Sequence, residues 1–415
     1  MGINGKHVIK NTLYLYILTF AKLIFPILTL PYLTRVLNTD TYGAVSYVKT
    51  FVSYVQIVID FGFIYSATKE VTEALRDNGN RSVNKIIGDT VMAKGLLGGL
   101  CLLGMIVFCC FVPLLRNNVL FTFLYVLSVL LSVFVPEFFF RGIEKMEYVS
   151  IPYTISKALA TGLTLVLIKS DADILLIPVL EIASTLISIA ISLFYLRKLG
   201  YSIECSSIKD AIEKIKGSFV YFISTFATTA FGALNTVLVG IFMTPSDVAY
   251  WSVCSVVVTA VQSMYNPLLN SLYPHMIKNK SKKLLKKTML LFMPIVTLGC
   301  VIAFIWSEPI LTLIFGTEYS VAASLFRYLI PLLFISFPSQ LYGWPALGAI
   351  DKAKEISGST VIAALVQIAG LVLLIMFDRF TFINLAIVRI ISELSMLVIR
   401  YSYYRKYKHL YAQGG

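Results

Sequence analysis

The stretch Val58–Val71, VIDFGFIYSATKEV, closes a long apolar run and yet contains an aspartate, Asp60. The next charged residues, Lys69 and Glu70, come more than a helical turn later. A carboxylate that faces hydrocarbon is costly, so we expect Asp60 to face a polar interior. Apolar runs like this one recur along the whole chain and decide its fold class.

Composition identifies the chain as an integral membrane protein. Of its 415 residues, 58% are hydrophobic and only 14% are charged, whereas soluble domains average about 25% charged residues. Its apolar runs reach about 20 residues, which is enough for ~30 Å of hydrocarbon and too continuous for barrel strands. We therefore predict an all-α membrane fold with about twelve transmembrane helices. The predicted spans are 9–36, 43–68, 85–113, 117–140, 149–169, 173–197, 213–243, 247–275, 286–306, 322–348, 355–377 and 380–404.

The distribution of basic residues predicts the topology. The net charge is +13, and most Lys and Arg fall in loops on the side that holds both termini. The opposite loops carry only Arg35, Arg116, Lys169 and Arg379. Cytoplasmic loops collect basic residues, so we expect a multi-pass protein of the inner membrane with both termini in the cytoplasm. This explanation of the charge leaves no reason to expect a nucleic-acid partner.

Catalytic and metal-binding motifs are absent from the sequence. The six cysteines lack metal-ligand spacing with histidine, and there is no P-loop or nucleophile elbow. We expect no enzyme activity, no metal site and no cofactor.

Ten charged residues lie inside the predicted spans. They are Lys22, Lys49, Lys94, Lys157, Arg327, Arg389, Asp60, Glu137, Glu181 and Glu393. Each costs about 2.5–3.5 kcal/mol near a helix centre if it faces lipid. Lys94, Glu181 and Arg327 could reach the interface by snorkelling. Lys22, Lys49 and Lys157 lie well inside their runs without an acidic partner one turn away, so we predict that they line a cationic, substrate-binding cavity.

A polar stripe explains Asp60 in part. Lys49, Ser53, Gln56 and Asp60 are spaced to share one face of a helix. Lys49 and Asp60 are about 16 Å apart along the axis, which is too far for direct pairing. We therefore expect Asp60 to be a coupling-ion site for H⁺ or Na⁺ or a lock near the gate, with tuning of Lys49 as the alternative. Glu137 either joins such a gate or anchors the end of a span.

The stripe recurs 206 residues later. Ser46 corresponds to Ser252 and Gln56 to Gln262, while Asp60 corresponds to Asn266. This repeat predicts two pseudo-symmetric six-helix lobes, 1–200 and 217–415, joined by a cytoplasmic linker at 201–216.

Further polar residues are candidates for the cavity lining, namely Thr161, Thr228, Asn235 and Gln262, together with Ser53 and Gln56. Small polar residues on a helix face also serve packing, which is the alternative. Arg389 and Glu393 are spaced i, i+4. They form either an internal ion pair or, with Arg389 on the substrate and Glu393 at a gate, part of the site.

Two motif blocks resemble a known family. The first is LPYLTRVLNTDTYGAVSYVKTFVSYVQIVIDFGFIYSATKEV, at 30–71, and the second is VPEFFFRGIEKMEYVSIPYTISK, at 135–157. Both are similar to elements of the O-antigen flippase (Wzx-like) family of polysaccharide biosynthesis transporters. Phe138 and Arg141 depart from the family pattern, where Trp and Gln are usual.

The resemblance implies the fold and function of the multidrug/oligosaccharidyl-lipid/polysaccharide exporter superfamily, with two lobes in a V shape. It implies an undecaprenyl-pyrophosphate-linked oligosaccharide, an O-antigen or capsule repeat unit, as substrate. A monomer would move it by alternating access, with the lipid tail in the membrane lipid and a glycan polymerase or ligase as partner. The alternatives are a multidrug exporter on the same fold, a membrane-embedded glycosyltransferase or polymerase, and a channel.

Overall fold

The computed structural model describes residues 5–76 and 80–411, except for the side chains of 5–9, 12, 80, 81, 224, 225 and 227–232. The described backbone is helical and contains no strand. The main helices are α1 (Gly5–Val36), α2 (Thr39–Asp60), α3 (Phe63–Arg76), α4 (Asn80–Phe111), α5 (Pro113–Arg116), α6 (Val119–Leu131), α7 (Glu137–Gly142), α8 (Glu147–Leu167), α9 (Leu176–Lys198), α10 (Ile208–Phe242), α11 (Pro245–Ser263), α12 (Asn266–Asn279), α13 (Lys282–Ile305), α14 (Ser307–Phe315), α15 (Ala323–Leu341), α16 (Ala353–Met376) and α17 (Phe382–Lys406). Short turns of helix complete the chain: η1 (Ser132–Phe134), η2 (Asp171–Asp173), η3 (Thr317–Ala322), η4 (Tyr342–Leu347), η5 (Gly348–Ile350) and η6 (Lys408–Leu410).

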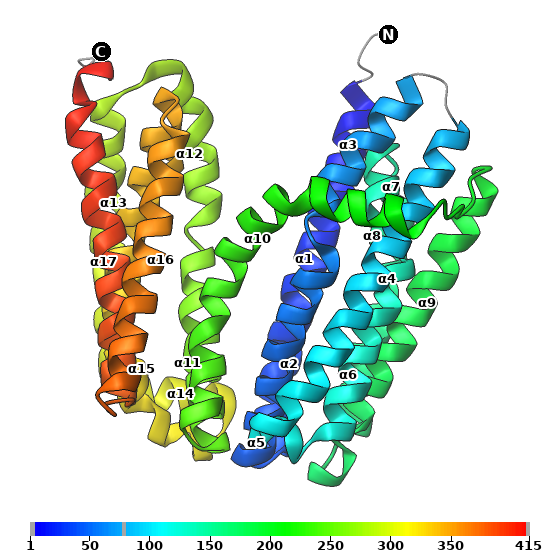
Figure 1. The fold of residues 1–415 in the computed structure, drawn as a ribbon. Coiled ribbons are helices and arrows are strands. Elements are labelled where there is room, and N and C mark those ends of the chain that lie inside the picture. Colours follow the sequence, from blue (N-terminus) through cyan, green and yellow to red (C-terminus); the bar gives the residue numbers. More distant parts are fainter. Residues whose placement is uncertain (1–4, 77–79, 412–415) are drawn as a thin grey trace. The chain divides into compact units, whose positions relative to one another are not determined.

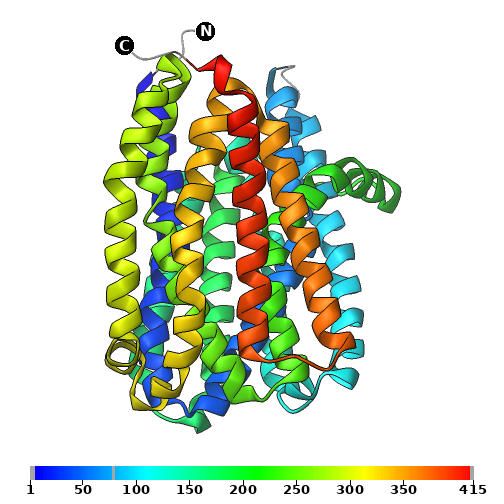
Figure 2. The same cartoon turned by 90° about the vertical axis from the view of Figure 1, so that its left-hand side faces the viewer.

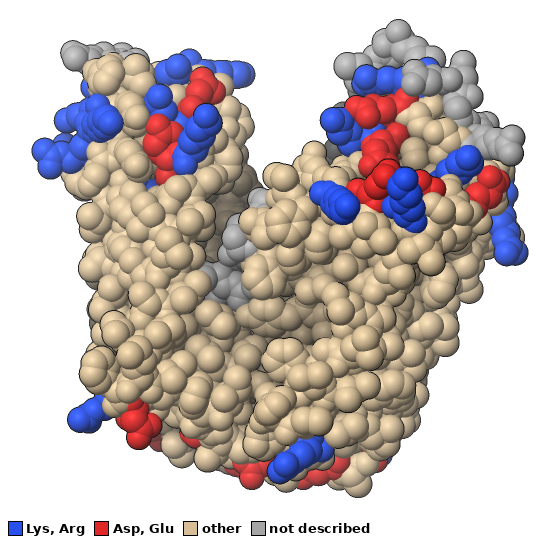
Figure 3. Space-filling model, in the orientation of Figure 1, with Lys and Arg blue, Asp and Glu red and all other residues tan. Residues whose placement is uncertain are grey.

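The predicted all-α membrane fold is confirmed. Among the described residues, ten helical segments are long and apolar enough to cross a membrane. The two other predicted spans, 149–169 and 213–243, correspond to α8 and α10. On the visible face of each unit, a broad band without charged side chains separates ends that carry Lys, Arg, Asp and Glu (Figure 3). Such a band is what a hydrocarbon layer requires.

Local sequence sets many of the helix boundaries. The side chain of Asn38 caps α2 by accepting a hydrogen bond from the Thr41 backbone at 2.7 Å. Ser207 caps α10 in the same way, and Thr381 caps α17. Polar caps of this kind satisfy backbone N–H groups that a helix start leaves free.

The second predicted span is broken where we expected a continuous helix over 43–68. Helix α2 ends at Asp60, and Phe61 and Gly62 adopt positive φ angles of 40° and 75° before α3 begins. The Phe61 ring stacks on Phe222 with centroids 4.2 Å apart, and this packing holds a conformation that a phenylalanine rarely adopts. The break leaves Asp60 at the end of a helix.

The chain divides into two compact units, Met1–Val248 and Ala249–Gly415. In the first unit α8 packs against both α1 and α9, α6 packs against α9 and α2, and α10 packs against α2 and α4 (Figure 1). Helix α9 ends at Lys198 and α10 begins at Ile208, so the connection between them spans 199–207. The lobe limits given by the sequence, with a linker at 201–216, stay a prediction.

In the second unit α17 packs against both α15 and α16 and lies between them (Figure 2). Its Arg400 is buried and holds this packing together. The guanidinium donates hydrogen bonds to the Ser339 carbonyl at 2.9 Å, the Ser359 hydroxyl at 3.0 Å and the Thr360 hydroxyl at 3.1 Å. A buried guanidinium needs such partners, so α17 is fixed in register against its two neighbours.

Helix boundaries repeat at the same spacing as the polar stripe. Four boundaries of the first half recur 206 residues later. Helix α1 ends at Val36, and α10 ends at Phe242. The other three are helix starts: α2 at Thr39 and α11 at Pro245, α8 at Glu147 and α16 at Ala353, and α9 at Leu176 and α17 at Phe382. The broken α2–α3 pair has a counterpart in α11 and α12. This agreement supports an internal duplication.

Candidate functional site

Two cavities lie inside the first unit, with volumes of about 580 Å³ and about 320 Å³. We call them the larger and the smaller cavity. Six residues line both cavities: Gln56, Ser132, Tyr153, Lys157, Glu181 and Thr185. Because α1, α2, α8 and α9 each contribute to both, the cavities follow one another along the same helices.

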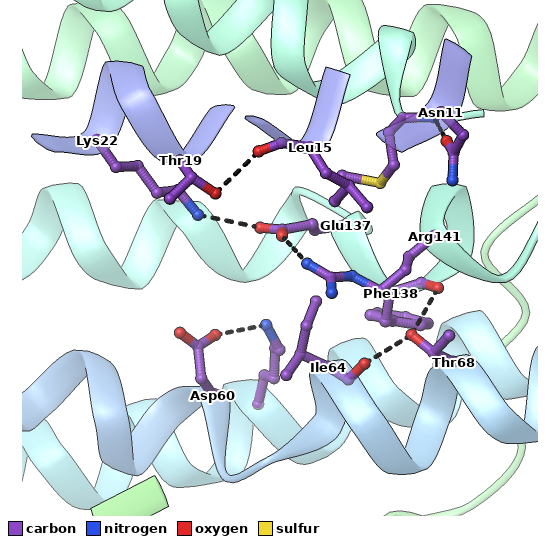
Figure 4. Close-up of polar contacts among 12 residues, drawn as sticks. Asn11, Leu15, Thr19, Lys22, Asp60, Ile64, Thr68, Glu137, Phe138 and Arg141 are labelled. Carbon is purple, nitrogen blue, oxygen red and sulfur yellow. Dashed lines mark hydrogen bonds and ion pairs between the residues drawn. The ribbon is translucent and has the colours of Figure 1, made fainter. Parts of the chain in front are cut away.

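A carboxylate bridges two cations in the larger cavity. Glu137 begins α7, and its two oxygens lie 3.4 Å from Lys22 Nζ and 3.2 Å from Arg141 Nη2 (Figure 4). Figure 4 shows the three side chains converging from α1 and α7. The Lys22 ammonium also lies 5.6 Å from the centre of the Tyr153 ring. The break before α7 therefore places Glu137 where it can hold Lys22, a residue from a distant part of the chain.

A second ion pair explains the aspartate at the end of α2. Asp60 Oδ1 accepts from Lys94 Nζ at 2.8 Å, and Asp60 Oδ2 accepts from Gln56 Nε2 at 2.7 Å. The Lys94 side chain is 10% exposed and that of Asp60 is 44% exposed. Lys94 thus lies inside the unit and does not snorkel to the surface. Asp60 supplies the negative charge that a buried ammonium requires.

The smaller cavity holds the third cluster. Lys157 of α8 forms an ion pair with Glu181 Oε2 of α9, and the Tyr125 hydroxyl lies 3.5 Å from Glu181 Oε1. Lys49 lines the same cavity and makes no hydrogen bond or ion pair with the described residues. It lies in the electrostatic field of both Lys157 and Glu181.

Seven of the predicted site residues line these cavities: Lys22, Lys49, Gln56, Asp60, Glu137, Lys157 and Thr161. The other polar candidates of the first unit do not. Ser53 is exposed and donates to the Thr50 carbonyl at 2.6 Å, and Asn235 is buried in α10. The Thr228 side chain lies outside the described residues.

The remaining predicted residues belong to the second unit and do not line these two cavities. Gln262 is half-buried in α11. Arg389 donates a hydrogen bond to Gln367 Oε1 at 2.9 Å, and Glu393 is buried one turn later. Glu393 lies in the electrostatic field of Arg389 and Arg400.

The lining residues that sequence reasoning did not assign to the site include Lys94, Tyr125, Arg141, Tyr153 and Glu181. One signal for Glu181 was present in the sequence. Ser184, Ser188 and Ser192 are spaced by four residues on α9, and all three line the larger cavity with Glu181. A polar stripe next to a charged residue inside an apolar run predicts a helix face directed at a cavity.

The charges in this site do not balance. Five basic side chains line the two cavities, namely Lys22, Lys49, Lys94, Arg141 and Lys157, against three acidic ones, Asp60, Glu137 and Glu181. With all eight groups ionised, the cavities carry an excess of two positive charges. Such a site favours an anion. Among the described residues, no group of three His, Cys, Asp or Glu side chains could hold a metal ion.

Comparison with known proteins identifies the family. The family described as polysaccharide biosynthesis protein matches residues 8–280, which include the first unit from residue 8 onward and every residue that lines the two cavities. The chain belongs to this polysaccharide biosynthesis protein family.

Two relatives match this chain over most of their length. The chain is 27% identical over 367 residues to a Shigella dysenteriae protein named "Putative O-antigen transporter", covering 86% of this chain and 91% of the relative. It is 21% identical over 375 residues to an Escherichia coli K12 protein of the same name, covering 89% and 90%.

Solved structures of transporters share the fold of this chain. A structure of the lipid II flippase MurJ in an inward closed conformation matches with a TM-score of 0.69 at 14% identity, covering 95% of this chain and 87% of that one. A multidrug resistance MATE transporter of the MOP superfamily, in an inward-facing conformation, matches with a TM-score of 0.62 at 11% identity, covering 94% of each chain. At these identities the likeness concerns the fold alone.

Proposed function

We propose that this protein is a flippase that moves an undecaprenyl-pyrophosphate-linked oligosaccharide, an O-antigen or capsule repeat unit, across the cytoplasmic membrane. One observation carries the proposal. Lys22, Lys49 and Lys157, from three different helices, all line the paired cavities of the first unit. A diphosphate that crosses hydrocarbon needs cations in a polar passage, because a charge without them is too costly to bury.

The charge of the site suits such a substrate. A diphosphate diester carries two negative charges, and the cavities have two positive charges in excess. A Lys about 4 Å from a phosphate charge contributes about 4 kcal/mol at an effective dielectric constant of 20. The hydroxyls of Tyr125 and Thr161 and the amide of Gln56 offer hydrogen bonds to sugar hydroxyls.

The comparisons support the same class of substrate. Both curated relatives are named as O-antigen transporters, and the fold is shared with a lipid II flippase. The substrate would keep its polyprenyl tail in the bilayer while its head group crosses by alternating access of the two lobes. Asp60, paired with Lys94, is the proposed site for a coupling H⁺ or Na⁺. The protein would lie in the inner membrane as a monomer, next to a glycan polymerase or ligase.

The test replaces each cavity lysine by alanine and follows glycan at the cell surface. We expect Lys49→Ala and Lys157→Ala to lower export at least tenfold at equal protein level, because each loses a phosphate ligand. The exposed Lys198, at the end of α9, supplies a matched control, Lys198→Ala, that keeps normal export.

Unchanged export in both cavity variants would contradict the proposal. Resistance to cationic drugs that depends on Glu137 or Glu181, without glycan export, would identify a multidrug exporter instead.

A further inference from the structure

One ion pair lies where the two cavities meet. Lys157 and Glu181 line both cavities, and their side chains are 18% and 25% exposed. On α8 the lining passes from Val149 in the larger cavity, through Lys157, to Thr164 in the smaller one. On α9 it passes from Ser192 through Glu181 to Ile177. The pair therefore lies at the level where one cavity gives way to the other.

Both oxygens of Glu181 are occupied. Lys157 holds Oε2, and the hydroxyl of Tyr125, from α6, lies against Oε1. Helices α6, α8 and α9 thus meet at this carboxylate. As long as Glu181 keeps these partners, the Lys157 and Glu181 side chains stay joined at the place where the two cavities meet.

Cationic side chains lie in both cavities, on either side of the pair. Lys22 and Arg141 share Glu137 in the larger cavity, so two cations there have one carboxylate between them. Beyond the pair, Lys49 has no carboxylate partner among the described residues and lies in the field of Lys157. A dianion could therefore move from the first group of cations to the second by way of Lys157.

We propose that the Lys157–Glu181 ion pair is an internal gate that a diphosphate group opens by replacing Glu181 as the partner of Lys157. The inference rests on the proposed function for the source of the anion. The diphosphate carries two negative charges and the carboxylate only one, so the diphosphate attracts Lys157 more strongly, and it is also attracted by Lys49. Glu181 then releases the Lys157 side chain, and the two cavities become one passage.

The gate is tested by the reactivity of single cysteines on its two sides. Ala160 lines only the smaller cavity and Ser184 only the larger one. Ala160→Cys and Ser184→Cys are introduced separately into the full chain with its six native cysteines replaced by alanine. The rate of modification by a negatively charged methanethiosulfonate reagent is measured on purified protein reconstituted in sealed liposomes, and vesicles of the two orientations expose one face at a time to the reagent.

From the face nearer Ser184 we expect Ala160→Cys to react at least tenfold more slowly than Ser184→Cys. Glu181→Gln raises the rate at Ala160→Cys about tenfold and changes that at Ser184→Cys less than twofold. Inorganic pyrophosphate gives the same rise in the modification rate at Ala160→Cys when Lys157 and Glu181 are both present. Lys157→Gln abolishes this response to pyrophosphate. The exchange Lys157→Glu with Glu181→Lys restores slow reaction, which a merely disturbed fold would not do.

Equal modification rates at the two cysteines would overturn the gate. Rates that change neither with Glu181→Gln nor with any diphosphate would overturn it as well. A second arm uses farnesyl diphosphate in place of inorganic pyrophosphate. A response to both probes shows that the diphosphate alone opens the gate, and a response to the lipid alone assigns the opening to the lipid-linked form. The measurement needs no transport, so the gate and the flippase activity can fail separately.

Discussion

Asp60 and Lys94 form a 2.8 Å ion pair in which the lysine is far more buried than the aspartate. Asp60 closes α2 at a helix break and has a second partner in Gln56, whereas Asp60 is the one acidic partner of Lys94 among the described residues. The two residues therefore do not depend on each other equally.

Replacing the aspartate should be the more harmful of the two changes. Asp60→Asn leaves a buried ammonium without its counter-charge, and we expect a loss of about 2–4 kcal/mol of stability. Lys94→Met leaves a half-exposed carboxylate that still accepts from Gln56, and we expect about 1 kcal/mol. Thermal unfolding in detergent measures both, and Asp60→Asn with Lys94→Met should recover most of the loss. The reverse order of stabilities would show that the lysine reaches water.

Substitution by alanine should have opposite effects on stability at two glycines, Gly43 and Gly99. A Cβ at Gly43 would lie 1.8 Å from the Pro245 carbonyl oxygen, so Gly43→Ala forces the start of α11 away and should cost about 2 kcal/mol or more. Nothing lies within 4 Å of a Cβ at Gly99 in α4, and Gly99→Ala should gain about 0.5–1 kcal/mol of helix stability. Folded yield and melting temperature report both. A stable Gly43→Ala variant would contradict this close approach.

Arg400 should be the arginine on which the second unit depends most. It is buried, and it donates to α15 and α16 from α17. Arg400→Lys keeps the charge but cannot reproduce three bonds from one planar group, so we expect a loss of about 2–4 kcal/mol. Arg405 is exposed near the end of the same helix, and Arg405→Lys is the control. Equal melting temperatures of the two variants would refute this role.

Reporter fusions should show both chain ends in the cytoplasm. Green fluorescent protein fused after residue 415 should fluoresce, and alkaline phosphatase inserted after Asp378, between α16 and α17, should be active outside. The Lys-rich loops on the side of the termini are the physical reason. An active phosphatase at the C-terminus with an inactive one at Asp378 would invert the topology.

Much of the fold could be predicted because hydrocarbon imposes one strong rule: apolar runs of sufficient length become helices. The breaks could not be predicted. Phe61 adopts a positive φ because its ring stacks on Phe222, a residue from a helix far along the chain. No local pattern around VIDFGF shows that contact.

The cations of the site could be predicted individually, whereas their partners could not. The sequence showed Lys22, Lys49 and Lys157 because a charged side chain inside an apolar run is costly unless it faces a polar interior. Glu137 lies 115 residues from Lys22, so their pairing depends on helix packing. Ser53 shares a helix face with Gln56, but its hydroxyl donates to the Thr50 carbonyl of the same helix, and Ser53 does not line a cavity.

The constant spacing of 206 residues has a consequence for how the two halves have diverged. Lys49 corresponds to Ser255 and Asp60 to Asn266, so the two copies of the repeat differ in charge at these positions. Four helix boundaries nevertheless kept their register. The two halves therefore share these boundaries in spite of different chemistry and of unequal helices between them, since α4 has 32 residues and α13 has 24.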